Sequence, residues 1–268
     1  MIGSLEHPII SFSDKYKMRK DRNFYVMEEN SGYVLLDLEE NYIKNGADPQ
    51  ISYSYQYGEI FHCSDYTDTG NDYERNGCRI LPGDYVVDIG GNMGIFARRA
   101  WERGAEKIIS FEPQRKVFSC FLENSKEGME PYNFAISDSE KFAILDFGGS
   151  LENTGGGSIS ANYKEMGIEI LHEEKVFCTT LNKLIQIGVI PKCDFLKIDC
   201  EGAEYEVLKG ISDENLSSVR CISMEIHRNV IDDSRKDEIL KRIENLGFKI
   251  FQMFWADALI TVNCWKEK

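Results

Sequence analysis

The sequence has no long apolar run and too few positive charges to balance its acids. No stretch approaches the roughly 20 consecutive apolar residues of a membrane-spanning helix, and charges occur throughout residues 1–20, so we expect no membrane span and no secretory signal. Lysine and arginine number 31 against 45 aspartates and glutamates, a formal net charge of -14. Because nucleic-acid backbones and anionic membrane surfaces bind basic patches, we expect neither as a partner.

Cys-x-x-Cys pairs are also missing, although the chain has eight cysteines. Zinc sites and thioredoxin-like sites usually contain such pairs, so neither is expected. We interpret the cysteines as reduced thiols, mostly small core residues, in a cytoplasmic protein. They are Cys63, Cys78, Cys120, Cys178, Cys193, Cys200, Cys221 and Cys264.

The chain changes character near residue 78. Residues 1–77 are rich in tyrosine and phenylalanine and contain strand-like pieces, among them a predicted hairpin of 24–27 with 33–38. With 268 residues, the chain is long enough for one large domain and a smaller extension. We predict an N-terminal extension of residues 1–77, packed on a main domain of residues 78–268.

Strand and helix patterns alternate from residue 81 onward, which indicates an α/β fold. Buried parallel strands are predicted at 85–89, 107–111, 132–136, 195–199 and 219–226, and the clearest helix at 234–246. Residues 248–255 and 259–265 are joined by so short a link that they must pair antiparallel. The predicted fold class is a Rossmann-like, mostly parallel seven-stranded sheet that ends in an antiparallel hairpin.

An irregular region, residues 142–178, separates the third and fourth predicted strands. It is long for a plain connection, so we expect a hairpin insert near the active site. Its three consecutive glycines, residues 155–157, predict a segment that contacts or closes over a substrate.

Residues 88–94 join the first parallel strand to its helix with the sequence Asp-Ile-Gly-Gly-Asn-Met-Gly. A nicotinamide-binding loop needs Gly-x-Gly-x-x-Gly, but Asn92 and Ile95 stand where the second and third glycines belong. The spacing Asp-x-Gly-x-x-x-Gly instead fits a loop that surrounds the methionine part of S-adenosylmethionine. The backbone N–H groups of such a loop can hold the carboxylate of the methionine part. The predicted cofactor residues here are Asp88, Gly90, Gly91, Asn92 and Gly94; a tight turn without a ligand is the alternative.

Glu112 ends the second strand, roughly 20 residues past the glycines, at the place where a carboxylate accepts both ribose hydroxyls. We predict that Glu112 and the adjoining Pro113 border the cofactor ribose. By the same topology, Ala135, Ile136 and Ser137 at the end of the third strand should border the adenine.

Charged side chains mark the ends of the fourth and fifth strands. Because side chains two apart on a strand share a face, Lys197, Asp199 and Glu201 point the same way, as do Glu225 and His227. Ligands bind at these strand ends in open α/β sheets. A buried ion pair between Lys197 and Glu225 is expected to orient the sheet, whereas Asp199, Glu201 and His227 are the predicted active-site residues; Asp199 is also a predicted cofactor contact.

The motifs at 87–94, 111–113, 133–137, 196–204 and 224–227 resemble the FkbM family of methyltransferases, with Lys-Ile-Asp-x-Glu-Gly-x-Glu the most specific run. The resemblance covers about residues 70–265. It implies a class I methyltransferase fold, S-adenosylmethionine as methyl donor, S-adenosylhomocysteine as product, and O-methylation of a sugar, glycan or secondary metabolite. Gly91 departs from the family, whose members often have alanine there.

An alcohol becomes a good nucleophile when a base removes its proton, so we predict that Asp199 or His227 takes the hydroxyl proton while Glu201 orients the acceptor. Mg²⁺ held between strand ends is disfavoured, because the acids lack the usual dense spacing, and no metal site is predicted. Two further function classes stay open, an NAD-dependent oxidoreductase and a non-catalytic S-adenosylmethionine-binding module. The oligomeric state stays open as well.

Overall fold

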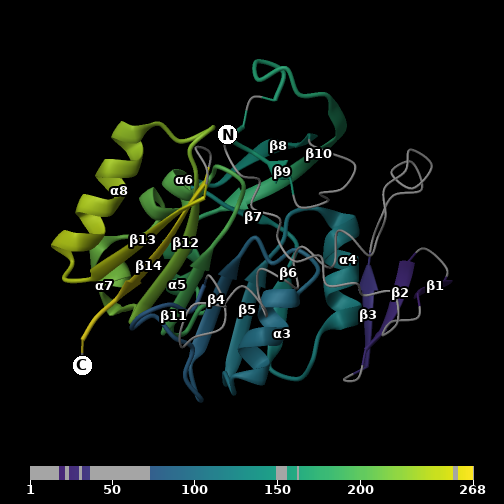
Figure 1. Ribbon diagram of the computed structural model, residues 1–268, viewed down its shortest axis with the longest axis horizontal. Coiled ribbons are helices and arrows are strands. Elements are labelled where there is room, and N and C mark those ends of the chain that lie inside the picture. Colours follow the sequence, from purple (N-terminus) through teal and green to yellow (C-terminus); the bar gives the residue numbers. More distant parts are fainter. Residues whose placement is uncertain are drawn as a thin grey trace, which may run out of the picture.

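The structure of the protein is a computed structural model, which describes residues 18–21, 24–29, 32–36, 73–148, 156–161, 163–255 and 259–267. Figure 1 shows a central sheet with helices on both sides and a second, smaller sheet beside it. In the described ranges, no helix combines the length and the apolar character needed to cross a membrane.

The central sheet has seven strands, in the order β13-β14-β12-β11-β4-β5-β6. Strands β4, β5, β6, β11 and β12 pair in parallel, and β14 runs antiparallel to both β12 and β13. The predicted α/β sheet with a terminal antiparallel hairpin is therefore confirmed. The strands are β4 (Tyr85–Ile89), β5 (Lys107–Phe111), β6 (Met129–Tyr132), β11 (Phe195–Ile198), β12 (Cys221–His227), β13 (Lys249–Trp255) and β14 (Leu259–Trp265).

Helices cover both faces of this sheet. On one face lie α3 (Ile95–Glu102) and α4 (Arg115–Asn124), and on the other lie α5 (Leu181–Gln186), α6 (Glu204–Lys209), α7 (Asp213–Ser218) and α8 (Asp233–Asn245). Three of the helices begin where a side-chain oxygen accepts a backbone N–H three residues on, at Thr180, Ser212 and Asp232.

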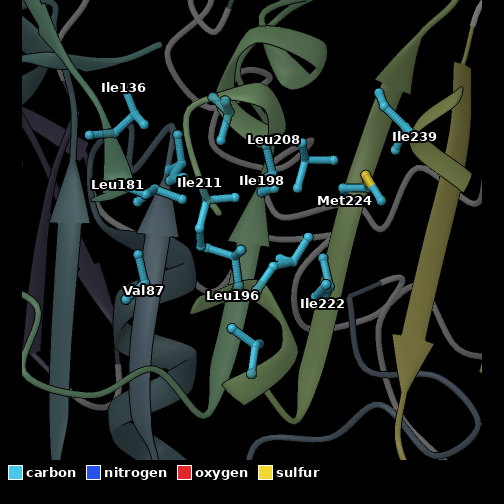
Figure 2. Packing of buried hydrophobic residues seen from close by; sticks show 14 of the residues in the cluster. Val87, Ile136, Leu181, Leu196, Ile198, Leu208, Ile211, Ile222, Met224 and Ile239 are labelled. Atoms are coloured by element: carbon cyan, nitrogen blue, oxygen red, sulfur yellow. The ribbon is translucent and has the colours of Figure 1, made fainter. Parts of the chain in front are cut away.

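The larger hydrophobic core lies between the sheet and helices α5 to α8. Figure 2 shows side chains of three neighbouring strands that meet there, among them Val87, Leu196 and Ile222, each no more than 1% exposed. Alternate residues of the same strands point to the opposite face, because strand side chains alternate. The two faces differ in chemistry, since the face toward α3 also carries buried polar groups.

The sheet order reverses at β4, which lies between β5 and β11. β5 and β6 continue the chain to one side of β4, and β11 and β12 continue it to the other. In α/β sheets, ligands usually bind outside the carboxyl ends of the strands at such a reversal of the strand order.

The prediction of one strand over residues 132–136 is wrong, because the structure has two short strands there. β6 ends at Tyr132, and Ala135–Ile136 form β7, which belongs to the second sheet and pairs in parallel with β10. Between them, the Asn133 side chain donates to the carbonyl oxygens of Glu112 and Pro113, at 2.9 Å each. The Asn133 side chain binds the backbone of the loop after β5 just where β6 stops pairing. The alternation of strand residues in the sequence gives no sign of this contact.

The second sheet contains the predicted insert. β8 (Lys141–Gly148) and β10 (Ile170–Thr179) pair antiparallel, which confirms the expected hairpin, and the short β9 (Gly157–Ser158) lies on the outer side of β8. Ser158 ties the insert to the main sheet, because its Oγ donates to the carbonyl oxygen of Glu201 at 2.6 Å. Gly155, the first of the three glycines, lies outside the described residues.

The described part of the N-terminal segment is a small antiparallel sheet of β1 (Met18–Asp21), β2 (Phe24–Glu29) and β3 (Gly32–Leu36). β2 and β3 form the predicted hairpin, and β3 lies against α4 (Figure 1). Tyr73 and Glu74 are 2% and 0% exposed and pack in the main domain. The division at residues 77 and 78 stays a prediction.

Seven of the eight cysteines are in the described ranges and all seven are free thiols, five of them buried. This agrees with the interpretation of the cysteines as reduced core residues; Cys63 lies outside these ranges.

We predict that Ile222→Ala lowers the free energy of unfolding by about 2–5 kcal/mol, the usual cost of a cavity at a fully buried isoleucine. Ile187, which is 57% exposed, offers the matched control, and Ile187→Ala should change stability by no more than about 0.5 kcal/mol. Urea denaturation followed by circular dichroism measures both. Equal losses for the two variants would contradict the placement of the core.

Candidate functional site

A row of buried polar side chains crosses the face of the sheet under α3. Its members occupy paired positions on five neighbouring strands and are at most 3% exposed. Each needs a hydrogen-bond partner, because an unpaired buried polar group is costly. Ser110 Oγ donates to Asp88 Oδ2 at 3.1 Å, and Asn263 Nδ2 donates to Ser223 Oγ at 2.8 Å. The row runs Ser110, Asp88, Lys197, Ser223, Asn263.

Lys197 supplies the positive charge of this row. Its Nζ lies 3.3 Å from Asp88 Oδ1 and 3.4 Å from Asp199 Oδ2, and it donates to the carbonyl oxygen of Gly90 at 2.7 Å. Burial by itself would lower the pKa of Lys197, but Asp88, Asp199 and, more weakly, Glu225 hold it above its usual range. The ion pair between Lys197 and Glu225 stays a prediction; the aspartates have the larger effect on the pKa of Lys197, and β4 brings Asp88 beside Lys197 in register.

The loop of residues 90–94 is wedged between the ends of β5 and β11. Gly90 and Gly91 both donate their N–H groups to the carbonyl oxygen of Phe111, at 3.0 Å each. A Cβ on Gly90, whose φ is +79°, would lie 1.7 Å from the carbonyl oxygen of Asp199. Only glycine fits this contact, so the contact fixes the loop against the residue that follows β11.

The Phe121 ring of α4 occupies the space beside the other two glycines. A Cβ on Gly91 or on Gly94 would meet this ring at 2.7 Å. The departure from alanine at Gly91 is therefore matched by the position of Phe121. Asn92 has a left-handed φ of 47°, which asparagine tolerates, and its Oδ1 accepts from the N–H of Met93 at 2.7 Å.

Glu112 follows β5 directly and faces this loop. Its Oε2 accepts from the N–H of Asn92 and its Oε1 from the N–H of Gln114, at 2.9 Å each. Burial raises the pKa of Glu112 from its ordinary 4.5 to about 7, against the effect of the two N–H groups and Lys197. A buried carboxylate thus stands at the predicted position, and its contact with a ribose stays a prediction.

The other predicted cofactor residues lie where the main sheet meets the second one. Asn133 links the backbones of Glu112 and Pro113 to the loop after β6. Ala135, Ile136 and Ser137 are buried, and the N–H of Ser137 donates to the carbonyl oxygen of Thr179 at 2.8 Å. Asp88 itself is fully buried beneath the loop. Adenine contacts of these residues stay predictions.

The three predicted active-site residues lie together. Asp199 and Glu201 follow β11, His227 ends β12, and one ligand atom of each falls within 4.8 Å of the others. His227 Nε2 is 3.3 Å from Glu201 Oε2. Glu201 has a φ of 55°, an uncommon conformation for glutamate. The turn after β11 thus brings Glu201 beside His227 of the neighbouring strand.

Glu204, the first residue of α6, contacts His227 from the side opposite Glu201. Its side chain is fully buried, and Oε1 lies 3.0 Å from His227 Nδ1 while accepting the N–H groups of Cys200 and Gly202, at 3.3 and 3.0 Å. Burial alone would lower the pKa of His227, but Glu204, Glu201 and Asp199 raise it well above 6.5. Burial raises the pKa of Glu201 to about 7, and the charge of His227 opposes this rise. The carboxylates of Glu204 and Glu201 therefore favour the protonated form of His227.

Sequence reasoning missed three residues of the site. Glu204 is the last glutamate of the Lys-Ile-Asp-x-Glu-Gly-x-Glu run, and its place in that motif could have marked it as a site residue. Tyr73 gave no signal, because it lies in the extension before the first parallel strand; its hydroxyl is 2.9 Å from Asp199 Oδ2 and 2.7 Å from Glu225 Oε1. Ser158 lies among glycines, and only the folded structure reveals its bond to Glu201.

Known proteins resemble the chain over the residues that build this site. The family described as Methyltransferase FkbM domain matches residues 88–250. The chain is 28% identical over 150 residues to the hexuronic acid methyltransferase AglP of Haloferax volcanii, covering 55% of this chain and 57% of AglP. It is 24% identical over 224 residues to the 31-O-demethyl-FK506 methyltransferase FkbM of Streptomyces tacrolimicus, covering 72% of this chain and 81% of FkbM.

A third relative is much larger. The AMB antimetabolite synthetase AmbE of Pseudomonas aeruginosa is 26% identical over 231 residues, which cover 73% of this chain and 10% of AmbE. The chain thus spans a tenth of AmbE and less than two thirds of AglP.

We predict that Gly90→Ala removes binding of S-adenosylhomocysteine and destabilises the fold more than Gly83→Ala does. Both glycines have a positive φ, +79° and +83°, so both variants bear about 1–2 kcal/mol of backbone strain. Only the Cβ at position 90 meets another atom, the Asp199 carbonyl oxygen; nothing lies within 4 Å of a Cβ at position 83. Calorimetry and urea denaturation measure the two effects. Equal affinities in both variants would show that the close contact does not shape the cofactor loop.

We predict that wild-type stability falls relative to the Glu112→Gln variant as pH rises from about 4.5 to about 7. The folded protein keeps the Glu112 proton up to a pKa of about 7, whereas the unfolded chain releases it near 4.5. The folded state therefore binds more protons in this window, and its free energy of unfolding declines with rising pH. Glutamine cannot ionise, so the variant lacks this contribution. Parallel pH profiles of the two proteins, measured by urea denaturation, would contradict the raised pKa.

Proposed function

The chain belongs to the FkbM family of methyltransferases, and we propose that it transfers the methyl group of S-adenosylmethionine to a hydroxyl group of a sugar, glycan or secondary metabolite. The observation that carries this proposal is the cluster of Asp199, Glu201 and His227 beside the glycine loop, at the carboxyl ends of β11 and β12. The relatives AglP and FkbM, named as a hexuronic acid methyltransferase and a 31-O-demethyl-FK506 methyltransferase, support a hydroxyl acceptor.

The donor site fits the groups of S-adenosylmethionine by its chemistry. The backbone of residues 90–94 approaches β11 so closely that it accepts no side chain at Gly90, and a loop without a side chain there lets a ligand approach the backbone closely. Glu112 offers a buried carboxylate to ribose hydroxyls. When bound, this donor supplies an activated methyl group on a positively charged sulfur.

The base that takes the acceptor proton is Asp199 in this proposal. Its Oδ2 is held by Lys197 and Tyr73, which fixes the carboxylate at the end of β11. His227 is less suited to accept a proton, because the carboxylates of Glu204 and Glu201 favour its protonated form. Its charge instead stabilises Glu201, which is placed to orient the acceptor hydroxyl. General-base assistance of this kind contributes roughly two to four orders of magnitude in rate.

Metal assistance is the disfavoured alternative. Asp199, Glu201 and His227 are spaced closely enough to surround an ion, but Glu201 and His227 already neutralise each other as an ion pair, and we assign no metal to them. EDTA followed by Mg²⁺ tests this alternative on the wild-type enzyme.

The insert supplies the acceptor side of the site in this proposal. The Ser158 hydroxyl donates to the backbone carbonyl of Glu201. Tyr163 lies in the same region, and its pKa is raised by burial and by the charges of Glu201 and Asp146. An acceptor that binds against β9 would therefore lie beside Glu201. We further propose that the acceptor is a small molecule or glycan rather than a nucleic acid, which the net charge of -14 supports.

The direct test of the function is transfer from S-adenosylmethionine with a labelled methyl group to a panel of acceptors. The panel contains neutral methyl glycosides, uronic acids and a macrolide alcohol, and the label should appear as an ether that resists mild alkali. Calorimetry with S-adenosylhomocysteine and NAD separates the methyltransferase from an oxidoreductase. Tight S-adenosylhomocysteine binding without transfer to any hydroxyl would favour a non-catalytic binding module.

We predict that Asp199→Asn lowers turnover by at least about a hundredfold, because asparagine keeps the shape of the side chain but cannot accept the proton. Binding of S-adenosylhomocysteine should change much less. His227→Gln, the comparison variant, should cause a smaller loss, since His227 acts through Glu201. Labelled-methyl transfer measures turnover and calorimetry measures binding. Near-normal turnover in Asp199→Asn would remove Asp199 from the proton transfer.

A further inference from the structure

Two successive residues after β11 have a left-handed backbone conformation. Glu201 has a φ of +55° and Gly202 a φ of +103°. Glycine adopts such angles freely, but a residue with a long side chain adopts them only where its surroundings hold it there. Among the described residues, the other two non-glycine residues with a positive φ are asparagines, which tolerate this conformation better. Glu201 is therefore a strained residue, and it belongs to the candidate site.

Contacts from three different segments hold this turn. From α6, Glu204 Oε1 accepts the N–H of Gly202 at 3.0 Å. From the loop after β12, the Val230 side chain lies so close to Gly202 that a Cβ there would meet it at 2.6 Å. From the insert, Ser158 Oγ donates to the carbonyl oxygen of Glu201 at 2.6 Å. Both ends of the peptide group between Glu201 and Gly202 are thus bonded, so this group cannot turn over without breaking two hydrogen bonds.

The Ser158 hydroxyl can donate in only one direction. The side chain is 1% exposed, and its Oγ accepts the N–H groups of Ser160 and Ala161, at 3.1 and 2.9 Å. A serine hydroxyl has one proton to donate and two lone pairs, so these N–H groups leave the proton for the carbonyl oxygen of the strained residue. The Tyr163 hydroxyl donates to the carbonyl oxygen of Gly156 at 2.8 Å, which closes the segment around Ser158.

The conformation of the turn decides where the Glu201 carboxylate lies. Its Oε2 is 3.3 Å from His227 Nε2, whereas the other ring nitrogen, Nδ1, is 3.0 Å from Glu204 Oε1. The same conformation brings a carboxylate oxygen of Glu201 within 4.8 Å of Asp199. A turn that relaxed to an ordinary φ would reorient the Cα–Cβ bond of Glu201 and carry its carboxylate away from both neighbours.

We propose that Ser158 is a positioning residue of the transfer site, whose hydroxyl holds Glu201 in the left-handed conformation that places its carboxylate beside His227. Ser158 belongs to β9 of the insert. The segment to which we assign acceptor binding therefore also fixes the residue that orients the acceptor hydroxyl. This role rests on the proposed O-methyl transfer, whereas the link from Ser158 through Glu201 to His227 is a property of the protein alone.

Nuclear magnetic resonance of the full chain, with isotope-labelled histidine ring nitrogens, tests this link without any acceptor. The chain has four histidines, and His227→Gln identifies the signals of His227. The spectra are compared at a pH where both proteins carry a protonated ring, so that the signals report hydrogen bonds rather than charge. In Ser158→Ala the Nε2 signal should move toward that of a ring in water, because Glu201 leaves it. The Nδ1 signal should stay, because Glu204 still binds that nitrogen.

The two nitrogens of one ring thus separate a specific effect from general loosening of the fold. An unchanged Nε2 signal, or equal shifts of Nε2 and Nδ1, overturns the proposal. Ser158→Cys is a second variant, which fills more of the buried space than alanine but donates only a weak hydrogen bond. It should move the Nε2 signal in the same direction, and it decides the test if Ser158→Ala does not fold.

Ser217→Ala is the matched control. The Ser217 hydroxyl also donates to the backbone carbonyl oxygen of a glutamate, Glu214, at 2.7 Å, but in α7 on the other face of the sheet. This variant should leave both His227 signals in place. An Nε2 shift as large as that of Ser158→Ala would overturn the link between Ser158 and the site.

Kinetics decide whether the link matters for methyl transfer. With the acceptor found by labelled-methyl transfer, Ser158→Ala should lower kcat by at least about tenfold, because a misplaced orienting group costs rate. Acceptor KM and S-adenosylhomocysteine affinity should change little, and Ser217→Ala should leave kcat unchanged. Equal kcat in wild type and Ser158→Ala overturns the positioning role even if the Nε2 signal moves. If no hydroxyl acceptor is found, the proposed function fails, while the resonance result still decides the link between Ser158 and His227.

Discussion

The site depends on one buried ammonium group. Lys197 lies inside the sheet, and a buried charge is tolerated only when partners of opposite charge and dipoles surround it. Its partners are Asp88 on the neighbouring strand, Asp199 after its own strand, and the carbonyl oxygen of Gly90 in the cofactor loop. Because all of them must stay in place together, one charge fixes both the glycine loop and the Asp199 carboxylate.

The same region carries more acids than bases, which makes proton sharing part of its design. Repulsion among carboxylates and loss of water both favour protonated forms, and Glu112 and Glu201 have pKa values raised to about 7. These raised values place groups that exchange protons near neutral pH beside the carboxylate that we assign as base. The acids are Asp88, Asp199, Glu201, Glu204 and Glu225, against Lys197 and His227.

The two faces of the sheet divide stability from chemistry. The face toward helices α5 to α8 is an apolar core, and the opposite face combines apolar contacts of α3 and α4 with the polar row (Figures 1 and 2). Two segments outside the main sheet contact residues that follow β11. Tyr73 comes from the N-terminal side and Ser158 from the insert, and each binds a group that follows β11. The site is thus assembled from parts that are distant in sequence but share one sheet edge.

Local patterns in the chain were enough to predict the fold class, the glycine loop and the position of Glu112 at its strand end. They also predicted the grouping of Asp199, Glu201 and His227, because the carboxyl ends of parallel strands lie at one edge of the sheet. Folding settled whatever depends on register and on side chains from remote segments. Register placed Lys197 beside Asp88, and Asn133 follows the third strand and binds the loop after β5. Tyr73 could not be found from its surroundings in the chain, because its partners lie 126 and 152 residues away and only folding brings them within hydrogen-bond reach.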